Sequence, residues 1–373
     1  MLPYILFLSI SLFCIYFFDV KGQKKGAGFF YAVLLLYAIL LSGLSYRIGT
    51  DIYNYSSSYD ELPDMSEFKW EQWFDYNYQP FYVLLCSVSR SISHDFYILH
   101  LFQSAIVCTV MFAFIHWRTK YHFTGLFVFI TIAYIYFCFD ILRESLAIVF
   151  VSLGYKYMEA GKYTRFYLFV CIAFMFHLSA IIAILFPVMQ RLRFDKSFLF
   201  ALGCMLVLLS LLESFSEYIF FYEKIYNKFS QYSEVESYNI NWYIGGFIRQ
   251  TVIPFLILCF LKRKFSRVPY EWALCFYVLC SIGMIKYNII FERPLNYVLP
   301  FVILSVTEML GKYLRGFSIC KVWVISLFLM FCAARNITYW RDGGWRILYP
   351  YSSIFTKKVD AMRENWLYDF WRH

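Results

Sequence analysis

The chain has 373 residues, of which 61% are hydrophobic and 23% aromatic, while only 16% carry a charged side chain. Soluble domains carry about 25% charged residues, so a water-soluble core would not hide this many apolar side chains. The net charge of +9 comes from basic residues dispersed among short loops, which argues against a nucleic-acid-binding protein. The sequence therefore predicts an all-α, polytopic bundle of transmembrane helices.

Apolar segments long enough to cross about 30 Å of hydrocarbon recur along the chain. We expect ten full spans, at residues 3–20, 28–45, 97–115, 123–139, 141–158, 198–212, 246–261, 270–286, 294–310 and 320–338. The first span lacks a basic start and a small-residue cleavage site, which indicates a retained helix rather than a signal peptide. Residues 1–338 are predicted to form a single transmembrane domain.

Two apolar segments do not have the pattern of a single span. Residues 79–92 are short and flanked by Pro80 and Arg90, which predicts a re-entrant or surface segment. Residues 165–190 are long for one span and are interrupted by His177, which predicts two half-helices meeting at the histidine. Irregular backbone at membrane depth is tolerated where protein buries it or where water fills a cavity.

The basic residues of the loops indicate the orientation. With an external N-terminus, every short basic loop falls on the cytoplasmic side, as the positive-inside rule expects. These loops contain Lys21, Lys24, Lys25, Arg118, Lys120, Lys156, Lys162, Arg165, Arg191, Arg193, Lys196, Lys262, Arg263, Lys264, Arg267, Lys312, Arg315 and Lys321. The outer loops, 47–95 and 213–245, are acidic and aromatic, so we expect them to fold onto the bundle. The aromatic, amphipathic tail 339–373 is expected to lie along the outer interface.

Charged residues that do not mark loops collect at the outer ends of the predicted spans. They are Arg47, Asp51, Asp140, Arg143, Glu144, Arg249, Glu292 and Arg293, with His177 at intermediate depth. Simpler interpretations exist, because Arg47 and Arg293 could snorkel at span ends. Arg143 and Glu144 are neighbours on different sides of a helix and could each pair elsewhere as packing contacts. Arg249 is followed by a long apolar stretch, so snorkelling explains it less well.

A phosphate-bearing lipid matches this set of side chains. The planar guanidinium forms bidentate hydrogen bonds with phosphate, which lysine does not. Four arginines are therefore predicted to bind a diphosphate: Arg47, Arg143, Arg249 and Arg293. Aromatic faces and amides bind carbohydrate, and the outer loops supply Tyr53, Tyr55, Gln79 and Trp242. The eleven cysteines show no CxxC motif and no His/Cys ligand spacing, so we expect no metal site and no cofactor.

Five short motifs follow one another along the chain. They are Arg47-Ile-Gly-Thr-Asp51-Ile-Tyr53, Gln79-Pro-Phe-Tyr82, Arg143-Glu-Ser-Leu-Ala147, Phe176-His177-Leu-Ser-Ala180 and Glu292-Arg293-Pro-Leu. Their order and spacing resemble the EpsG family of Wzy-type polysaccharide polymerases over most of residues 30–300. The family often has a glutamate where Gln79 stands and a glutamine where Glu144 stands, which leaves the roles of these two positions open.

The resemblance implies a multi-pass glycosyltransferase of the bacterial cytoplasmic membrane, with its active site facing the periplasm or exterior. Such enzymes join oligosaccharide repeat units carried on undecaprenyl diphosphate, and the lipid-linked oligosaccharide serves as both donor and acceptor. No nucleotide sugar and no obligatory metal is implied. Membrane lipid and chain-length regulator or flippase proteins are the partners expected, and nucleic acid is not.

Catalysis would then require charge stabilisation at the leaving diphosphate and a base for the acceptor hydroxyl. We assign Arg143, Arg249 and Arg293 to the diphosphate, with Arg47 as a fourth contact. His177 is the first candidate base, because the unperturbed pKa of histidine, about 6.5, suits neutral pH. A lone histidine on an apolar helix is, however, more often a packing residue. Two carboxylates complete the candidate catalytic set, namely Asp51, which could instead pair with Arg47, and Glu144.

Three other functions stay open from the sequence. A glycan ligase would use the same lipid donor with a different acceptor. A flippase or transporter of the lipid-linked unit would need charge along both leaflets, and the inner halves of the spans are nearly uncharged. A membrane acyltransferase could use His177 with Asp140.

Overall fold

The computed structural model describes residues 2–70, 76, 78–218, 240–285, 287–313, 319–340 and 344–372. The described residues form helices and no named strand, and their β-structure is an isolated antiparallel bridge between Ser45 and Ser353. The all-α class is therefore confirmed. The chain divides into two compact units, Met1–Ile184 with Asn336–His373, and Leu185–Arg335, which we describe one at a time. The single domain expected over residues 1–338 stays a prediction.

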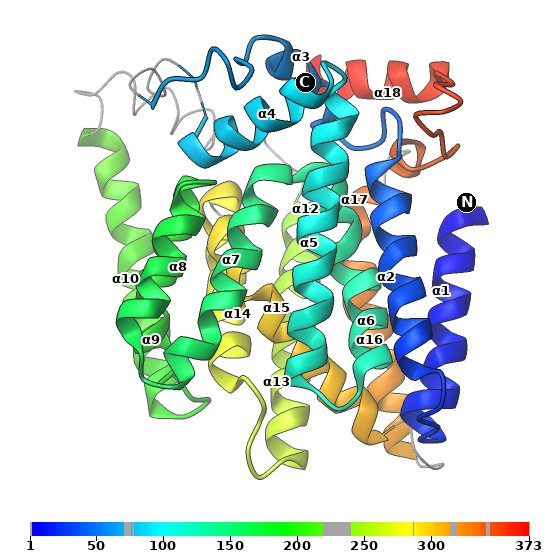
Figure 1. The fold of residues 1–373 in the computed structure, drawn as a ribbon. Coiled ribbons are helices and arrows are strands. Elements are labelled where there is room, and N and C mark those ends of the chain that lie inside the picture. The colour runs from blue at the N-terminus through cyan, green and yellow to red at the C-terminus, as the bar shows by residue number, and fades with distance from the viewer. Residues whose placement is uncertain are drawn as a thin grey trace. The chain divides into compact units, whose positions relative to one another are not determined.

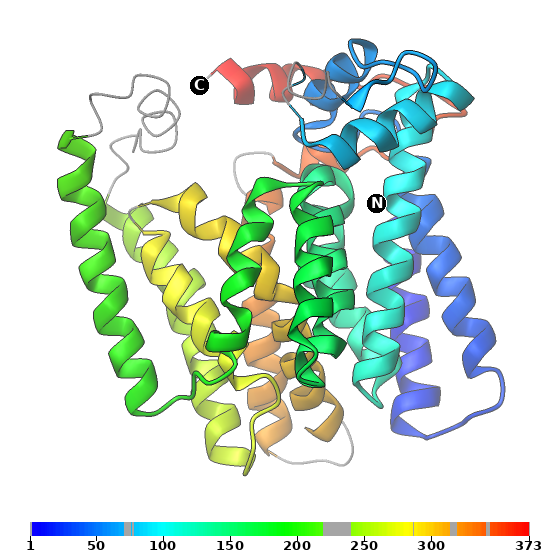
Figure 2. The same cartoon turned by 60° about the vertical axis from the view of Figure 1, so that its left-hand side comes forward.

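The first unit holds most of the predicted motifs. Its helices are α1 (Leu2–Cys14) with the π-helix η1 (Ile15–Val20), α2 (Ala27–Gly43), α3 (Ile52–Asp60), α4 (Pro80–Ile92), α5 (Phe96–Arg118), α6 (His122–Phe129) with η3 (Ile130–Tyr134) and η4 (Tyr136–Asp140), α7 (Leu142–Glu159), α8 (Tyr163–Phe174), the 3-10 helix η5 (Leu178–Leu185), α17 (Ile337–Trp340), η8 (Gly344–Ile347) and α18 (Ala361–Arg372). The long helices run side by side, with α2 packed on α5 and α7 packed on both α5 and α8 (Figure 1). Helices α3, α4 and α18 lie across one end of this bundle (Figures 1 and 2).

The basic loops of the first unit lie at the opposite end of its helices (Figure 2). There Arg118, the last residue of α5, pairs with Glu159, the last residue of α7. Asp19 accepts hydrogen bonds from the backbone and the hydroxyl of Thr124, at 2.7 and 2.8 Å, which ties η1 to the start of α6. Helix α5 has 23 residues, so about 34 Å separates the basic end from the end that carries α3 and α4.

The apolar outer surfaces of these helices indicate that lipid surrounds them. Four helices of the described residues are long and apolar enough to cross a membrane, namely Leu2–Val20, Phe96–Arg118, Ile244–Lys264 and Ile290–Tyr313. Shorter apolar helices coincide with the expected spans at 28–45, 123–139, 198–212 and 270–286. The expected spans at 141–158 and 320–338 coincide with the helices Leu142–Glu159 and Ile319–Arg335. Large apolar side chains point outward, as at Phe29 (68% exposed) and Leu36 (57% exposed) on α2. Such a surface requires lipid around it, which fits the polytopic membrane bundle predicted from the composition.

Both irregular segments have the structure that the sequence predicts. Residues 79–92 form α4, a helix of 13 residues at the end of the bundle rather than a span. The segment 165–190 is broken at His177, because α8 ends at Phe174 and a 3-10 helix begins at Leu178. Two half-helices therefore meet at the histidine.

The second unit contains the remaining spans. Its helices are α9 (Phe186–Met189), α10 (Lys196–Tyr218), α12 (Ile240–Phe247), η7 (Ile248–Val252), α13 (Ile253–Lys264), α14 (Glu271–Gly283), α15 (Asn288–Tyr313) and α16 (Ile319–Arg335). Its basic loops also meet at one end. Glu271 accepts from Lys262 Nζ at 2.6 Å and from the backbone N–H of Phe194 at 2.8 Å, and Lys312 Nζ donates to the carbonyl oxygen of Lys264 at 3.2 Å.

A buried carboxylate sets the position of the turn after α2. Asp140 accepts from the backbone N–H and the hydroxyl of Thr50, at 2.8 and 2.9 Å, and from the hydroxyl of Tyr339 in α17. Gly49 passes so close to η4 that a Cβ there would clash with the carbonyl oxygen of Phe139. Its φ of 125° lies in the region that favours glycine. The start of the 47–55 segment is therefore fixed against η4.

We predict that Gly49→Ala destabilises the purified protein in detergent, because the new methyl group meets backbone as well as an unfavourable φ. The apparent melting temperature should fall by about 5–10 °C. Gly161→Ala is the matched control, since Gly161 has a φ of 69° and nothing within 4 Å of its added Cβ. That variant should lose only about 2–5 °C. Equal losses in the two variants would contradict close packing at Gly49.

Candidate functional site

Arg143, the second residue of α7, lies among aromatic rings contributed by α3, α4 and the segment before α4. Its guanidinium carbon is 4.5 Å from the ring centroid of Tyr78, 5.7 Å from that of Tyr82 and 5.9 Å from that of Tyr55. Its Nη1 makes a long contact of 3.5 Å with Oε1 of Gln79. The structure thus brings together three residues predicted for the site, Arg143, Tyr55 and Gln79. We call Tyr55, Tyr78 and Tyr82 the tyrosine cluster.

The tyrosine cluster holds the cation without neutralising it. Tyr55 and Tyr82 are buried, and burial raises the pKa of Tyr82 well above its usual value, so its hydroxyl stays a neutral donor. The Nε of Arg143 is buried and has no hydrogen-bond partner among the described residues. Cation–π contacts offset part of the cost of burying the charge, but an unsatisfied N–H remains unfavourable. The arrangement is therefore suited to an anionic ligand.

His177 lies at the break between α8 and η5, where Ser179 orients its ring. Nδ1 is 2.6 Å from Oγ of Ser179 and 3.3 Å from the backbone N of Ser179. The backbone N–H of Ser179 donates to Nδ1, so Nδ1 is an acceptor and the neutral ring carries its proton on Nε2. A base at Nε2 would require the other tautomer, in which Nδ1 no longer accepts from the backbone of Ser179.

The start of α4 connects the histidine to the arginine. The backbone N–H of Phe81 donates to the carbonyl oxygen of Met175 at 3.0 Å, and the Phe81 ring packs edge-on against Phe176 at 5.8 Å. Phe81 follows Gln79 by two residues, and Met175 precedes His177 by two. The first turn of α4 therefore follows Gln79, which contacts Arg143, and packs through Phe81 against the break between α8 and η5.

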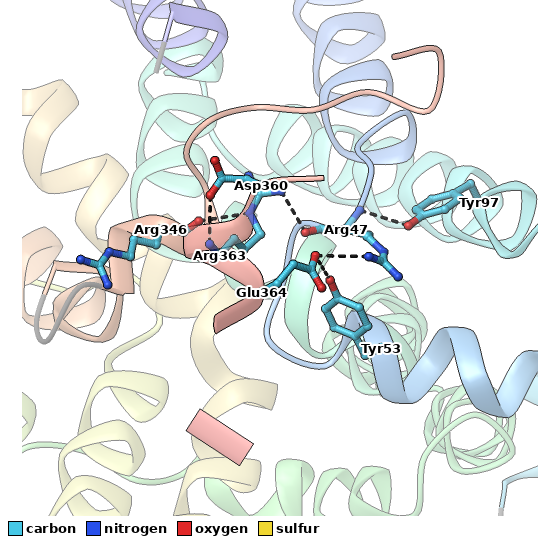
Figure 3. Close-up of polar contacts among 7 residues, drawn as sticks. All are labelled: Arg47, Tyr53, Tyr97, Arg346, Asp360, Arg363 and Glu364. Carbon is cyan, nitrogen blue, oxygen red and sulfur yellow. Dashed lines mark hydrogen bonds and ion pairs between the residues drawn. The ribbon is translucent and has the colours of Figure 1, made fainter. Parts of the chain in front are cut away.

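Arg47 forms a second cluster with the C-terminal tail (Figure 3). Its Nη1 lies 3.4 Å from Oε1 of Glu364 in α18, and its guanidinium carbon is 5.0 Å from the ring centroid of Tyr53. The hydroxyl of Tyr53 donates to the same Glu364 oxygen. Burial and this hydrogen bond raise the pKa of Tyr53. The carboxylate partner of Arg47 is thus Glu364, whereas the sequence suggested Asp51.

The two predicted carboxylates lie in different surroundings. Asp51 occupies the N-cap position of α3, although its side chain makes no capping hydrogen bond there. Glu144 follows Arg143 in the first turn of α7 and is buried, with 1% of its surface exposed. Their catalytic roles stay predictions, as do the sugar-binding roles of Tyr53 and Tyr55.

Arg249 and Arg293 belong to the second unit. Arg249 lies in the π-helix η7, a kind of irregularity often found at functional sites, and its Nε donates to the carbonyl oxygen of Gly245 at 3.0 Å. It precedes Lys264 by 15 residues, or about 22 Å of helix. Arg293 precedes Lys312 in α15 by 19 residues, or about 28 Å. Both arginines therefore lie toward the end of this unit that is opposite its basic loops.

Part of the predicted site stays outside the described residues. These include the side chain of Trp242 and residues 219–239 of the outer loop 213–245. The meeting of Arg249 and Arg293 with Arg47 and Arg143 stays a prediction.

The sequence places Tyr78 among the outer-loop aromatics that could bind carbohydrate and Tyr82 in the second motif, but it does not single out Glu364. The spacing of Tyr78 and Tyr82 on either side of Pro80 is a signal that could have identified the tyrosine cluster. Glu364 carries no such signal, because it lies in the tail far from the motif that it contacts.

Comparison with known proteins gives one finding. A family model described as the EpsG family matches residues 28–353, which include Arg47, the cluster around Arg143, the break at His177, and Arg293. No curated protein and no solved structure matches the chain. The resemblance inferred from the five motifs is confirmed, and the chain belongs to the EpsG family.

Proposed function

We propose that the protein is a polysaccharide polymerase that joins oligosaccharide repeat units carried on undecaprenyl diphosphate, at the outer face of the bacterial cytoplasmic membrane. Membership of the EpsG family supports a function in polysaccharide synthesis. The observation that carries the proposal is the guanidinium of Arg143, surrounded by the tyrosine cluster, with a buried Nε that lacks a partner among the described residues. An anionic group bound to a lipid is a ligand of the required charge and depth.

The distribution of charge within each unit supports this orientation. Basic loops collect at the cytoplasmic side of membrane proteins. In the first unit these loops lie at one end, and the segments carrying Arg47, Gln79 and Arg143 lie at the other. In the second unit Arg249 and Arg293 lie far from the contact between Lys312 and Lys264. The candidate site residues would thus face the exterior in both units.

The reaction transfers a growing glycan from one diphosphate to one hydroxyl. The bond between the anomeric carbon and the diphosphate oxygen breaks, and the acceptor hydroxyl oxygen bonds to that carbon while its proton passes to the base. Negative charge grows on the departing diphosphate. Arg143 would stabilise that charge, with Arg249, Arg293 and Arg47 as further donors. Preorganised donors in a site shielded from water usually supply the largest part of such stabilisation.

We assign the role of base to His177, which lies at the break between α8 and η5. Ser179 orients the imidazole through its contacts with Nδ1, and the first turn of α4 packs beside the break. Tyr78, the half-buried member of the tyrosine cluster, offers an aromatic surface on which a sugar ring can stack. A glycan ligase would use the same residues with another acceptor, so the product of the reaction distinguishes the two enzymes.

We predict that Arg143→Ala lowers polymerisation by about 10²–10³-fold, because a donor to the leaving group is lost. Arg143→Lys should restore little, since lysine keeps the charge but not the planar fork. The length of lipid-linked glycan in cells, resolved by electrophoresis, is the measurement.

Arg90→Ala is the matched control for this experiment. Arg90 lies on α4 and also packs against a tyrosine ring, but its Nη1 is used by the carbonyl oxygen of Tyr59. Polymer length should change little in this variant. Normal polymer from Arg143→Ala would overturn the diphosphate assignment of Arg143.

The arginines of the second unit give a separate prediction. Arg249→Ala and Arg293→Ala should each leave single repeat units on the lipid carrier and abolish long polymer, because both cations are assigned to the same diphosphate. The state of the lipid-linked glycan is read by mass spectrometry of a lipid extract. Unchanged polymer in both variants would show that the second unit does not contribute these cations.

His177→Ala should slow polymerisation by about 10²–10⁴-fold, the usual contribution of a positioned base. Ser179→Ala should slow it less, because only the orientation of the ring is lost. The rate is measured with purified protein and lipid-linked repeat units. His94→Ala, which changes an exposed histidine of the outer loop, is the control. A rate in His177→Ala equal to that control would exclude His177 as the base.

A further inference from the structure

The backbone N–H, the carbonyl oxygen and Nη1 of Arg47 each contact another segment of the first unit. Its φ of 54° is a left-handed backbone conformation that few residues other than glycine adopt. Its N–H donates to the hydroxyl of Tyr97 at 3.1 Å, and its carbonyl oxygen accepts from Nη1 of Arg363 at 3.1 Å. Its guanidinium contacts Glu364 and the ring of Tyr53. Strained residues fixed by surrounding contacts are common at functional sites.

Arg363 anchors the tail to this residue. It is 1% exposed, and its guanidinium donates to three carbonyl oxygens, those of Arg47, Arg346 (3.1 Å) and Pro350. Burial lowers the pKa of Arg363, so the cation depends on these oxygens for its stability. Asp360 accepts from the backbone N–H of Arg363 at 2.9 Å and fixes the first turn of α18. The planar guanidinium of arginine can donate hydrogen bonds in three fixed directions at once, which the ammonium group of lysine does not do.

A second attachment sets the register of the tail against the motif. The backbone N–H of Tyr46 donates to the carbonyl oxygen of Ser352, and that of Ile354 donates to Leu44, both at 2.9 Å. Ser45 and Ser353 face each other between these two bonds as an antiparallel pair. These contacts therefore fix the register in which the tail pairs with the residues that follow α2.

Glu364 orients the guanidinium of Arg47 but does not occupy all of its N–H donors. One carboxylate oxygen contacts Nη1 of Arg47 and the hydroxyl of Tyr53 (Figure 3). A guanidinium has five N–H donors, so donors remain for a second oxyanion. The side chain of Arg47 is 35% exposed, which leaves those donors accessible.

We propose that residues 344–372 act as a clasp that positions Arg47 for the diphosphate of the lipid-linked substrate. Arg363 anchors the clasp, and Glu364 is a positioning residue that acts on the reaction through Arg47. This inference rests on the proposed function and adds the tail to the active site. The clasp remains docked during turnover.

A disulfide tests the docking without reference to activity. The pair Ser45→Cys and Ser353→Cys occupies a non-hydrogen-bonded antiparallel position, where Cα atoms lie about 4.5 Å apart. That separation falls within the range that disulfides span. We expect the double variant to cross-link in intact membranes, as read by a mobility shift that a reductant reverses. Each single variant controls for pairing with the native cysteines.

The locked protein then distinguishes a clasp from an inhibitory strap. A clasp that stays docked predicts polymer of normal length in the cross-linked variant. Loss of polymer on oxidation, restored by a reductant, would show that the tail must leave during turnover and would overturn the proposal. Failure of the pair to cross-link would overturn the docking itself. Absence of polymerase activity in the unmodified protein would instead contradict the proposed function, while the cross-link would still report on docking.

A double-mutant cycle tests the action of Glu364 through Arg47. Glu364→Ala should lower kcat/KM for lipid-linked donor by about tenfold, the effect of losing one hydrogen bond to a charged group. Glu364→Asp should recover part of the loss. In the Arg47→Ala background, Glu364→Ala should have no further effect, because the residue acts through the missing guanidinium. Additive losses in the double variant would refute the positioning role.

Discussion

The buried carboxylate of Asp140 holds together three segments of the first unit that are distant in sequence. It ends η4, accepts both hydrogen bonds of Thr50, and accepts the hydroxyl of Tyr339. The turn after α2, the entry to α7 and the beginning of the tail therefore share one reference point. The Asp140 carboxylate thus fixes the backbone near both site arginines. Arg47 comes just before the turn that contains Thr50, and Arg143 follows Asp140 by three residues.

The structure accommodates three arginines in three different ways. Arg363 is buried and satisfied by carbonyl oxygens, so its role is mechanical. Arg47 is partly exposed and shares a carboxylate with Tyr53, which fixes its direction. Arg143 is surrounded by aromatic rings, and its Nε finds no acceptor among the described residues. Because unmet hydrogen-bonding capacity inside a protein is costly, the third arrangement is the one that a bound anion would stabilise most.

Much of the architecture could be predicted from hydropathy, because a bilayer imposes both the length and the apolar surface of each span. The break at His177 and the short helix after Pro80 were likewise visible as interruptions of apolar runs. Contacts such as Glu364 with Arg47 could not be predicted, since an amphipathic pattern specifies a face but not its partner. The roles of Asp140 and of the tyrosine cluster also depend on tertiary packing. The convergence of arginines from the two units rests on sequence alone.

The attachment of the tail to Arg47 has a consequence for biogenesis. In sequence, 316 residues separate Arg47 from Arg363, and every intervening helix is synthesised between them. At about 5–20 residues per second, the ribosome needs on the order of 15–60 s to cover that interval. Throughout it, the strained backbone of Arg47 lacks the hydrogen bond that its carbonyl oxygen accepts from Arg363. A nascent chain arrested within that interval would thus have helices inserted in the membrane, while the tail would not yet position the guanidinium of Arg47.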